Sequence, residues 1–174
     1  MIARLARDTR GVSVIEFAIV LPFLIALYLG GYQLSDAISA YRKVTTATRT
    51  VADVTSQFAS VSDTELDAVL AASQQVMTPY KVANAQLTVS QIVVSNGGAA
   101  TVDWSRGLNT PALKTGDPYT LPENIKQKNT SLIIATIRYN YVPIVAPALI
   151  GTIPMRDVII MSPRVTDTIK KKSA

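Results

Sequence analysis

The first feature of the chain is a continuous apolar run near its N-terminus. Between Val12 and Gly31, 20 residues carry a single charge, that of Glu16. A helix rises about 1.5 Å per residue, so a helix of this length spans about 30 Å, the thickness of a bilayer core. The pattern predicts a transmembrane helix. Pro22 lies inside it and predicts a kink, which packing against neighbouring helices would make easier to tolerate.

The composition of this run favours membrane insertion despite its acidic residue. Between Val12 and Leu34 there are 13 Val, Ile, Leu or Phe residues, which favour insertion by about 4 to 8 kcal/mol. A central acidic residue costs about 2.5 to 3.5 kcal/mol on the same scale, and Glu16 is near one end of the run. An acid retained in such a segment is a candidate functional residue. The arginines at positions 4, 7 and 10 predict a cytoplasmic N-terminus, with the rest of the chain outside.

The helical period continues beyond the membrane segment. Apolar residues recur every seven positions in two interleaved series, which are Ala37, Val44, Val51 and Phe58, and Ala40, Ala47 and Val54. We therefore expect one helix over 12–60, membrane-spanning to about residue 31 and amphipathic after it. The small alanines would allow close approach either to the chain's own domain or to a neighbouring helix.

A second, shorter helix is expected over 63–77. Ser62 and Glu65 have the spacing of a capping box, and Thr78-Pro79 should end the helix. The expected buried stripe is Leu66, Val69, Leu70 and Val76. The acids at positions 63, 65 and 67 could form a cation site, but acids in a first turn also complement the helix dipole, which is the simpler interpretation.

From Ala85 the hydrophobic period changes to two, which is typical of strands. The pattern predicts strands at 85–94, 101–104, 131–141 and 155–161, the last of which Val165 could extend, with a turn at Asn96-Gly97-Gly98. Residues 107–128 should form a long loop that carries specificity or only connects the strands. Residues 142–148 interrupt the strands, and 169–174 are expected to be disordered. The fold class is α+β, a long N-terminal helix followed by a short helix and a small antiparallel sheet.

The composition argues against an enzyme. The chain has no cysteine and no histidine, so thiolate metal sites, cysteine nucleophiles and the commonest general base are excluded. No catalytic set and no cofactor motif is found, and we expect no metal. The net charge of +5 is modest and its only lysine run is Lys170 to Lys172, which we interpret as a solvated tail. We expect no nucleic-acid partner.

The N-terminus has a basic leader that ends at Arg10-Gly11 and is followed directly by Val12 to Phe17. In these residues it resembles a type IV prepilin of the short-leader class found in tight-adherence (Tad, Flp-type) pili. The run from Glu16 to Pro22, with Tyr32-Gln33-Leu34 and Ala47-Thr48-Arg49, is similar to the TadE-like pseudopilin (minor pilin) family. Tyr139 to Pro143 and Ser162-Pro163-Arg164 resemble the C-terminal part of that family less specifically.

The resemblance implies a pilin-like fold and a processed membrane subunit. A prepilin peptidase would remove residues 1–11 by cutting between Gly11 and Val12, and Glu16 would become the fifth residue of the mature chain. In pilins this carboxylate is thought to meet the free N-terminal amine of a neighbouring subunit, and Glu16 and Phe17 would therefore serve assembly. A buried pair of this kind would specify register more than it adds stability. Phe17 departs from major pilins of this class, which often have tyrosine there.

Further consequences of the resemblance concern partners and location. The chain would lie in the bacterial inner membrane with residues 61–174 as a periplasmic α+β domain, and could join a surface pilus used in attachment. Its partners would be the prepilin peptidase, other pilins and pseudopilins, and the inner-membrane assembly platform. A domain of this size departs from a major Flp pilin and implies a minor subunit.

Three alternatives to a pseudopilin remain at this point. An ordinary cleaved signal peptide would have a shorter apolar core without Glu16 and Pro22. An uncleaved signal-anchored scaffold or binding protein of the envelope would keep its leader. An enzyme on an anchor would need a general base that the sequence does not provide.

Overall fold

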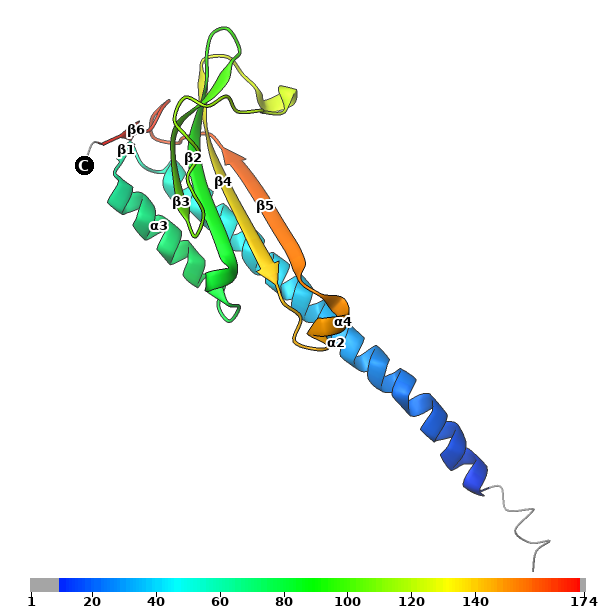
Figure 1. Cartoon of the computed structure of the whole chain (residues 1–174). Coiled ribbons are helices and arrows are strands. Elements are labelled where there is room, and N and C mark those ends of the chain that lie inside the picture. The colour runs from blue at the N-terminus through cyan, green and yellow to red at the C-terminus, as the bar shows by residue number, and fades with distance from the viewer. Residues whose placement is uncertain (1–9, 173–174) are drawn as a thin grey trace, which may run out of the picture.

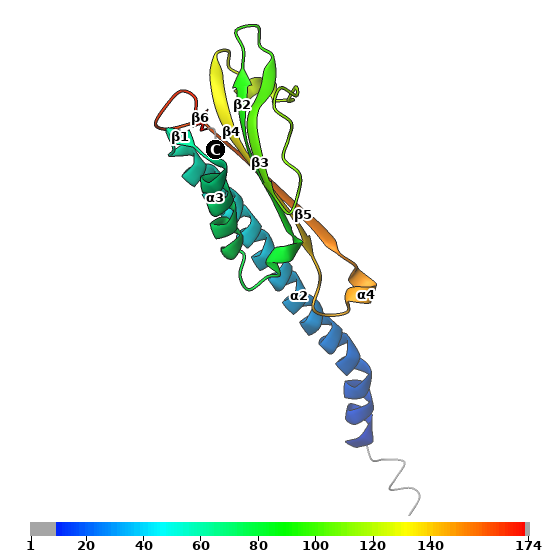
Figure 2. The ribbon, with the colours of Figure 1, turned by 60° about the vertical axis from the view of Figure 1, so that its left-hand side comes forward.

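The computed structural model describes residues 10–172. One long helix runs along the sheet and extends beyond it (Figure 1). Helix α2 spans Arg10–Ser56, 47 residues including Pro22. Its N-terminal half extends away from the rest of the molecule, and its C-terminal half lies along a sheet, as the two views in Figures 1 and 2 agree. Helix α3, Asp63–Gln75, lies beside this second half.

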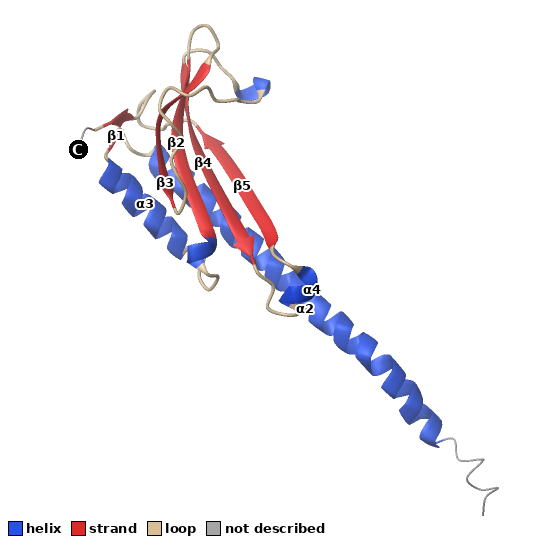
Figure 3. Cartoon of the chain, in the orientation of Figure 1, coloured by secondary structure: helices blue, strands red, loops and turns tan. Residues whose placement is uncertain are grey.

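The sheet has four antiparallel strands in the order β3-β2-β4-β5 (Figure 3). These strands are β2 Ala85–Val94, β3 Ala100–Leu108, β4 Thr130–Tyr141 and β5 Ile153–Met161. The hairpin between β2 and β3 turns at Gly98, whose φ of 82° suits glycine. The predicted α+β class is therefore confirmed. All four predicted strands are observed, β2 with the predicted bounds and the other three with longer ones.

The inner face of the sheet and the two helices enclose the main core. Val44, Ala47 and Val51 of α2 are fully buried against it. The heptad pattern therefore packs on the chain's own domain, one of the two alternatives that the sequence left open; the other was a neighbouring helix. Phe58 is only half-buried and Val54 is 37% exposed, so the C-terminal end of the pattern is not fully covered.

A second apolar cluster lies on the outer face of the sheet. Ile92, Val102 and Ile134 are buried there with Leu121 of the long connection between β3 and β4. This connection therefore does more than join two strands, because it covers part of the outer face. It begins later than the predicted residue 107, since Gly107 still belongs to β3. A Cβ at Gly107 would lie 2.3 Å from the carbonyl oxygen of Thr110, so only glycine fits.

Both helices end slightly before the predicted residues. Helix α2 was expected to reach residue 60 but ends at Ser56, whose carbonyl accepts the N–H of Arg164 at 2.9 Å. Its last turn tightens, with Gln57 bonded to the carbonyl of Val54. Helix α3 ends at Gln75, and the chain continues through turns to Pro79. The capping box of Ser62 and Glu65 is confirmed.

The prediction of a disordered C-terminus is wrong for the described residues. Strand β6, Lys170–Lys171, pairs in parallel with β1, Ser60–Val61. Ile169 is fully buried in the main core. Val165, expected as an extension of the last strand, lies instead in the exposed turn that brings the chain back. The polar composition of this end predicted disorder, but one apolar residue, Ile169, anchors it through contacts with strands that are distant in the sequence.

Short elements complete the chain. They are the 3-10 turns η1, Val82–Asn84, and η2, Glu123–Ile125, and the one-turn helix α4, Pro147–Ile150, between β4 and β5. Helix α4 lies in the segment where the sequence predicted an interruption of the strands, and Figure 1 places it at the end of the sheet nearest the extended part of α2.

Candidate membrane-inserted assembly segment

The N-terminal half of α2 exposes nearly all of its apolar side chains. In its most apolar 18-residue window none of the residues is buried, and the mean hydropathy is 2.4. Phe23, Leu27 and Tyr28 are each more than 70% exposed. A helix that is apolar on all sides is stable only when lipid or other helices cover it. The described chain therefore contains one candidate membrane span, as the sequence predicted.

The predicted site residues lie at the N-terminal end of this span. Gly11 and Val12 are in the first turn of α2, because the helix begins at Arg10 rather than at the predicted residue 12. Glu16 and Phe17 follow within the next two turns and are both exposed. Glu16 forms no ion pair with another residue of 12–172, the range in which charged side chains are described. The other predicted leader residues, 1–9, lie outside the described residues.

A polar cluster marks the place where the exposed helix enters the domain. Gln33 is only 6% exposed. Its Oε1 accepts the N–H groups of Ile144 at 3.1 Å and Val145 at 2.9 Å, and its amide donates to the hydroxyl of Tyr141. One side chain of α2 therefore binds both the end of β4 and the loop that follows it. The burial of the glutamine is compensated because its donor and its acceptor are both used.

Asp36, one turn further along α2, accepts hydrogen bonds from two tyrosine hydroxyls. Tyr141 donates to its Oδ2, and Tyr80 donates to its Oδ1 at 3.0 Å. The two tyrosine rings contact each other edge to face, with centroids 6.3 Å apart. Burial, with the hydrogen bond to Asp36 second, raises the pKa of Tyr80 to about 12, and the same two causes raise the pKa of Tyr141. Both hydroxyls therefore stay protonated and keep donating at neutral pH.

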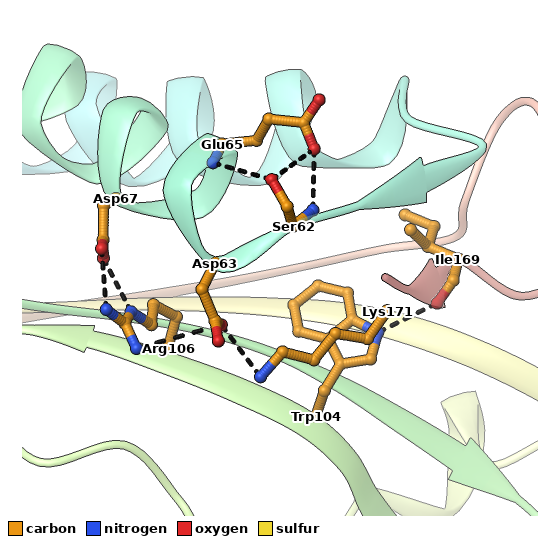
Figure 4. A network of polar contacts seen from close by, with 8 residues as sticks. All are labelled: Ser62, Asp63, Glu65, Asp67, Trp104, Arg106, Ile169 and Lys171. Carbon is orange, nitrogen blue, oxygen red and sulfur yellow. Dashed lines mark hydrogen bonds and ion pairs between the residues drawn. The ribbon is translucent and has the colours of Figure 1, made fainter. Parts of the chain in front are cut away.

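The three acids at the start of α3 take part in ion pairs or in the capping box (Figure 4). Arg106 donates to both oxygens of Asp67, each at 2.7 Å, which lowers the pKa of Asp67. Lys171 of β6 lies 2.9 Å from Asp63. Glu65 closes the capping box, with its Oε2 2.7 Å from the N–H of Ser62. Among the described residues no group of three acids could hold a metal ion. The lysine run, interpreted from the sequence as a solvated tail, supplies part of this network.

The same close-up shows how the C-terminal segment is held. The indole N–H of Trp104 donates to the carbonyl of Ile169 at 3.0 Å (Figure 4). Gln91 binds both backbone groups of Ile169, accepting from its N–H at 2.9 Å and donating to its carbonyl at 3.1 Å. A buried glutamine on a strand and a buried tryptophan thus pair with a returning chain end.

Sequence reasoning missed the cluster of Gln33, Asp36 and Tyr141. Tyr139 and Tyr141 lie near the end of the predicted strand 131–141, and both are buried. A polar residue directly after a membrane-length apolar run, followed three positions later by an acid, was the available indication. The sequence could not supply the partners, because they lie more than 100 positions away from Gln33 and, for Tyr141, from Asp36.

These features define a class: an α+β domain built around the continuation of a helix that can span a membrane. Residues 11–53 match the family model described as TadE-like protein. The resemblance inferred from the sequence is thereby confirmed over the exposed half of α2 and most of its packed half. The match covers about a quarter of the 174 residues, and it is consistent with a TadE-like protein of the Tad pilus system. No curated protein and no solved structure matches the chain.

Proposed function

We propose that this chain is a minor pilin of a Tad-type pilus, made as a prepilin and assembled through the N-terminal half of α2. The observation that carries the proposal is the exposed apolar helix with its single acid at Glu16, within the stretch that matches the TadE-like family. A peptidase would cut between Gly11 and Val12. The domain would stay outside the cytoplasm and, after assembly, decorate or initiate a filament used in surface attachment.

The physical role proposed for Glu16 follows from where it lies. Its carboxylate projects from a helix whose neighbouring side chains Ile15 and Phe17 are about 60% exposed. In lipid an unpaired carboxylate is costly, and a neighbouring chain's new amino terminus would offset that cost. Cleavage at Gly11 would create this amine, so processing and assembly would be coupled. We propose that the chain acts as a structural subunit and not as an enzyme.

The proposal is tested with two substitutions in the host cell. Gly11→Ala should leave a full-length precursor in the membrane, and Glu16→Ala should be cleaved normally but enter filaments poorly. N-terminal mass spectrometry measures cleavage, and the amount of the protein in sheared filaments measures assembly. The matched controls are Gly30→Ala, where an added Cβ meets nothing within 4 Å, and Glu123→Ala, whose side chain is 86% exposed.

Normal cleavage of Gly11→Ala together with normal assembly of Glu16→Ala would contradict the proposal. A wild-type protein that keeps residues 1–11 in the cell would favour the alternative of an uncleaved, signal-anchored scaffold or binding protein.

A further inference from the structure

The connection between β4 and β5 is an uncharged apolar loop. Residues 142–152, called here the apolar loop, contain no acidic or basic side chain. Val142 is 50% exposed, Ile144 67% and Ile150 49%. Single exposed apolar residues are common on protein surfaces, but three within nine positions of one loop form a patch. Nothing in the fold of the described chain covers them.

The apolar loop is fixed to α2 just beyond the candidate membrane span. Gln33 accepts the N–H groups of Ile144 and Val145. It lies two residues after Gly31, where the predicted membrane span ends. At about 1.5 Å per residue this is about 3 Å along the axis. Figures 1 and 2 both show α4, which is part of the loop, at the end of the domain nearest the extended part of α2.

The opposite end of the domain has a different character. The long connection between β3 and β4 reaches the far end of the sheet in Figure 1 and carries the charged residues Lys114, Asp117, Glu123, Lys126 and Lys128. The two connections therefore differ along the axis of α2. The uncharged apolar loop lies at the end nearest the apolar half of the helix, with Asp36 and Lys81 beside it, and the charged connection reaches the opposite end.

We propose that the apolar loop contacts the lipid bilayer, with Val142, Ile144 and Ile150 entering the boundary between headgroups and acyl chains. This inference rests on the membrane anchor of the proposed function. If residues up to about 31 cross the bilayer, the loop lies at the level where that helix leaves it. Apolar side chains gain free energy when they leave water there, and the absence of charge removes the main penalty.

Lipid fits this surface better than a second copy of the chain does. The patch is fixed through Gln33 to α2, next to the apolar stretch that must itself be covered in the membrane, and it lies at the level where the predicted membrane span ends. A second contact point beside the helix would restrict how the domain tilts and rotates above the bilayer. It would thus hold the waiting subunit in one orientation before it is extracted into a filament.

The absence of native cysteine allows a direct test. Ile144→Cys is spin-labelled in the full chain, reconstituted in phosphatidylcholine–phosphatidylglycerol liposomes at high lipid excess, and its exposure to oxygen and to a water-soluble nickel chelate is measured. The matched control is Val165→Cys, which is 59% exposed and follows Arg164, bonded to Ser56 at the far end of α2. The emission of buried Trp104 reports that each variant is folded.

We expect the label at position 144 to collide with the nickel chelate several-fold less often than the label at position 165, and more often with oxygen. A third label at Leu24 separates this inference from the proposed function. If Leu24 lies in the bilayer but Ile144 is as accessible to nickel as Val165, only the lipid contact is wrong. If Leu24 is itself in water, the membrane anchor fails as well.

A second series varies the ratio of protein to lipid. Protection of position 144 that persists unchanged on dilution with lipid supports the contact with the bilayer. Protection that disappears on dilution would assign the apolar loop to contacts between copies of the chain and would overturn the proposal.

Discussion

At the scale of single residues, the carboxylate of Asp36 connects three segments. It lies on α2 and accepts hydrogen bonds from the hydroxyl of Tyr80, which follows α3, and from that of Tyr141, at the end of β4. A charged acceptor with two phenolic donors makes stronger hydrogen bonds than a neutral one. The cluster therefore couples the helix that leaves the domain to both sides of the fold at the point of exit.

The raised pKa of Tyr80 predicts a loss of stability at high pH. Burial and Asp36 favour the neutral phenol, so the pKa of Tyr80 is about 12 in the folded chain, against 10.0 for a solvated tyrosine such as the unfolded chain presents. Its contribution is fully present below pH 10 and is lost as the pH rises through about 12, because the unfolded chain then releases its proton first. Chemical unfolding in detergent, followed by Trp104 fluorescence between pH 8 and 12, measures this effect.

Tyr80→Phe should be less stable than wild type at pH 8 and should lose less stability between pH 10 and 12. Tyr41→Phe, which removes a hydroxyl from a residue 47% exposed, should behave like wild type. Equal slopes for Tyr80→Phe and wild type above pH 10 would show that this hydroxyl is not held as described.

At the scale of elements, the C-terminal segment is attached to the domain by one short strand and one buried side chain. Strand β6 is only two residues long, yet it pairs with β1 and follows the fully buried Ile169. Arg164 forms an ion pair with Asp53 at 2.5 Å, close to the end of α2. Such exposed pairs contribute little on their own. The apolar anchor is therefore expected to supply most of the stability of this element.

Ile169→Ala should lower the free energy of unfolding by about 2 to 5 kcal/mol, the range found when a buried large aliphatic residue is truncated. Urea unfolding of the full chain in detergent, observed through Trp104, measures it. Val165→Ala, in the exposed turn of the same segment, is the matched control and should change stability by less than about 0.5 kcal/mol. A small effect at Ile169 would mean that the segment is not docked in solution.

At the scale of the whole molecule, one helix serves two environments. Its N-terminal half exposes apolar side chains all round, while Val44, Ala47 and Val51 of its C-terminal half are fully buried in the core of the domain. The domain therefore has no complete core without this part of α2. Because α2 is continuous from Arg10 to Ser56, its exposed half and its packed half are joined without a loop.

The chain cut to begin at residue 32 should fold as a domain without detergent, whereas the chain cut to begin at residue 57 should not. The longer piece keeps the buried positions of α2, and the shorter one leaves the inner face of the sheet open to water. Circular dichroism and Trp104 emission distinguish the two results. A cooperatively unfolding 57–174 piece would show that α2 is dispensable for the core.

The sequence alone was sufficient for features that depend on local pattern. The length of the apolar run, the heptad spacing of Val44 and Val51 and the capping box of Ser62 are set by residues close together in the chain. They specified the candidate membrane span and the TadE-like resemblance over the N-terminal helix, and the period of two from Ala85 onward added the strands that make the class α+β. Cleavage at Gly11 and the role of Glu16 remain predictions.

Only the tertiary structure decided which distant segments meet. One such contact is the backbone pairing of β6 with β1. The others are made by side chains: Gln91 and Trp104 bind Ile169, and Gln33 binds the apolar loop. These side-chain contacts join residues 65 to 112 positions apart. Periodicity carries no information about such contacts, because it reports which face of an element is apolar but not what covers that face. Distant segments pair because burying their apolar and polar groups against each other lowers the free energy of the folded chain.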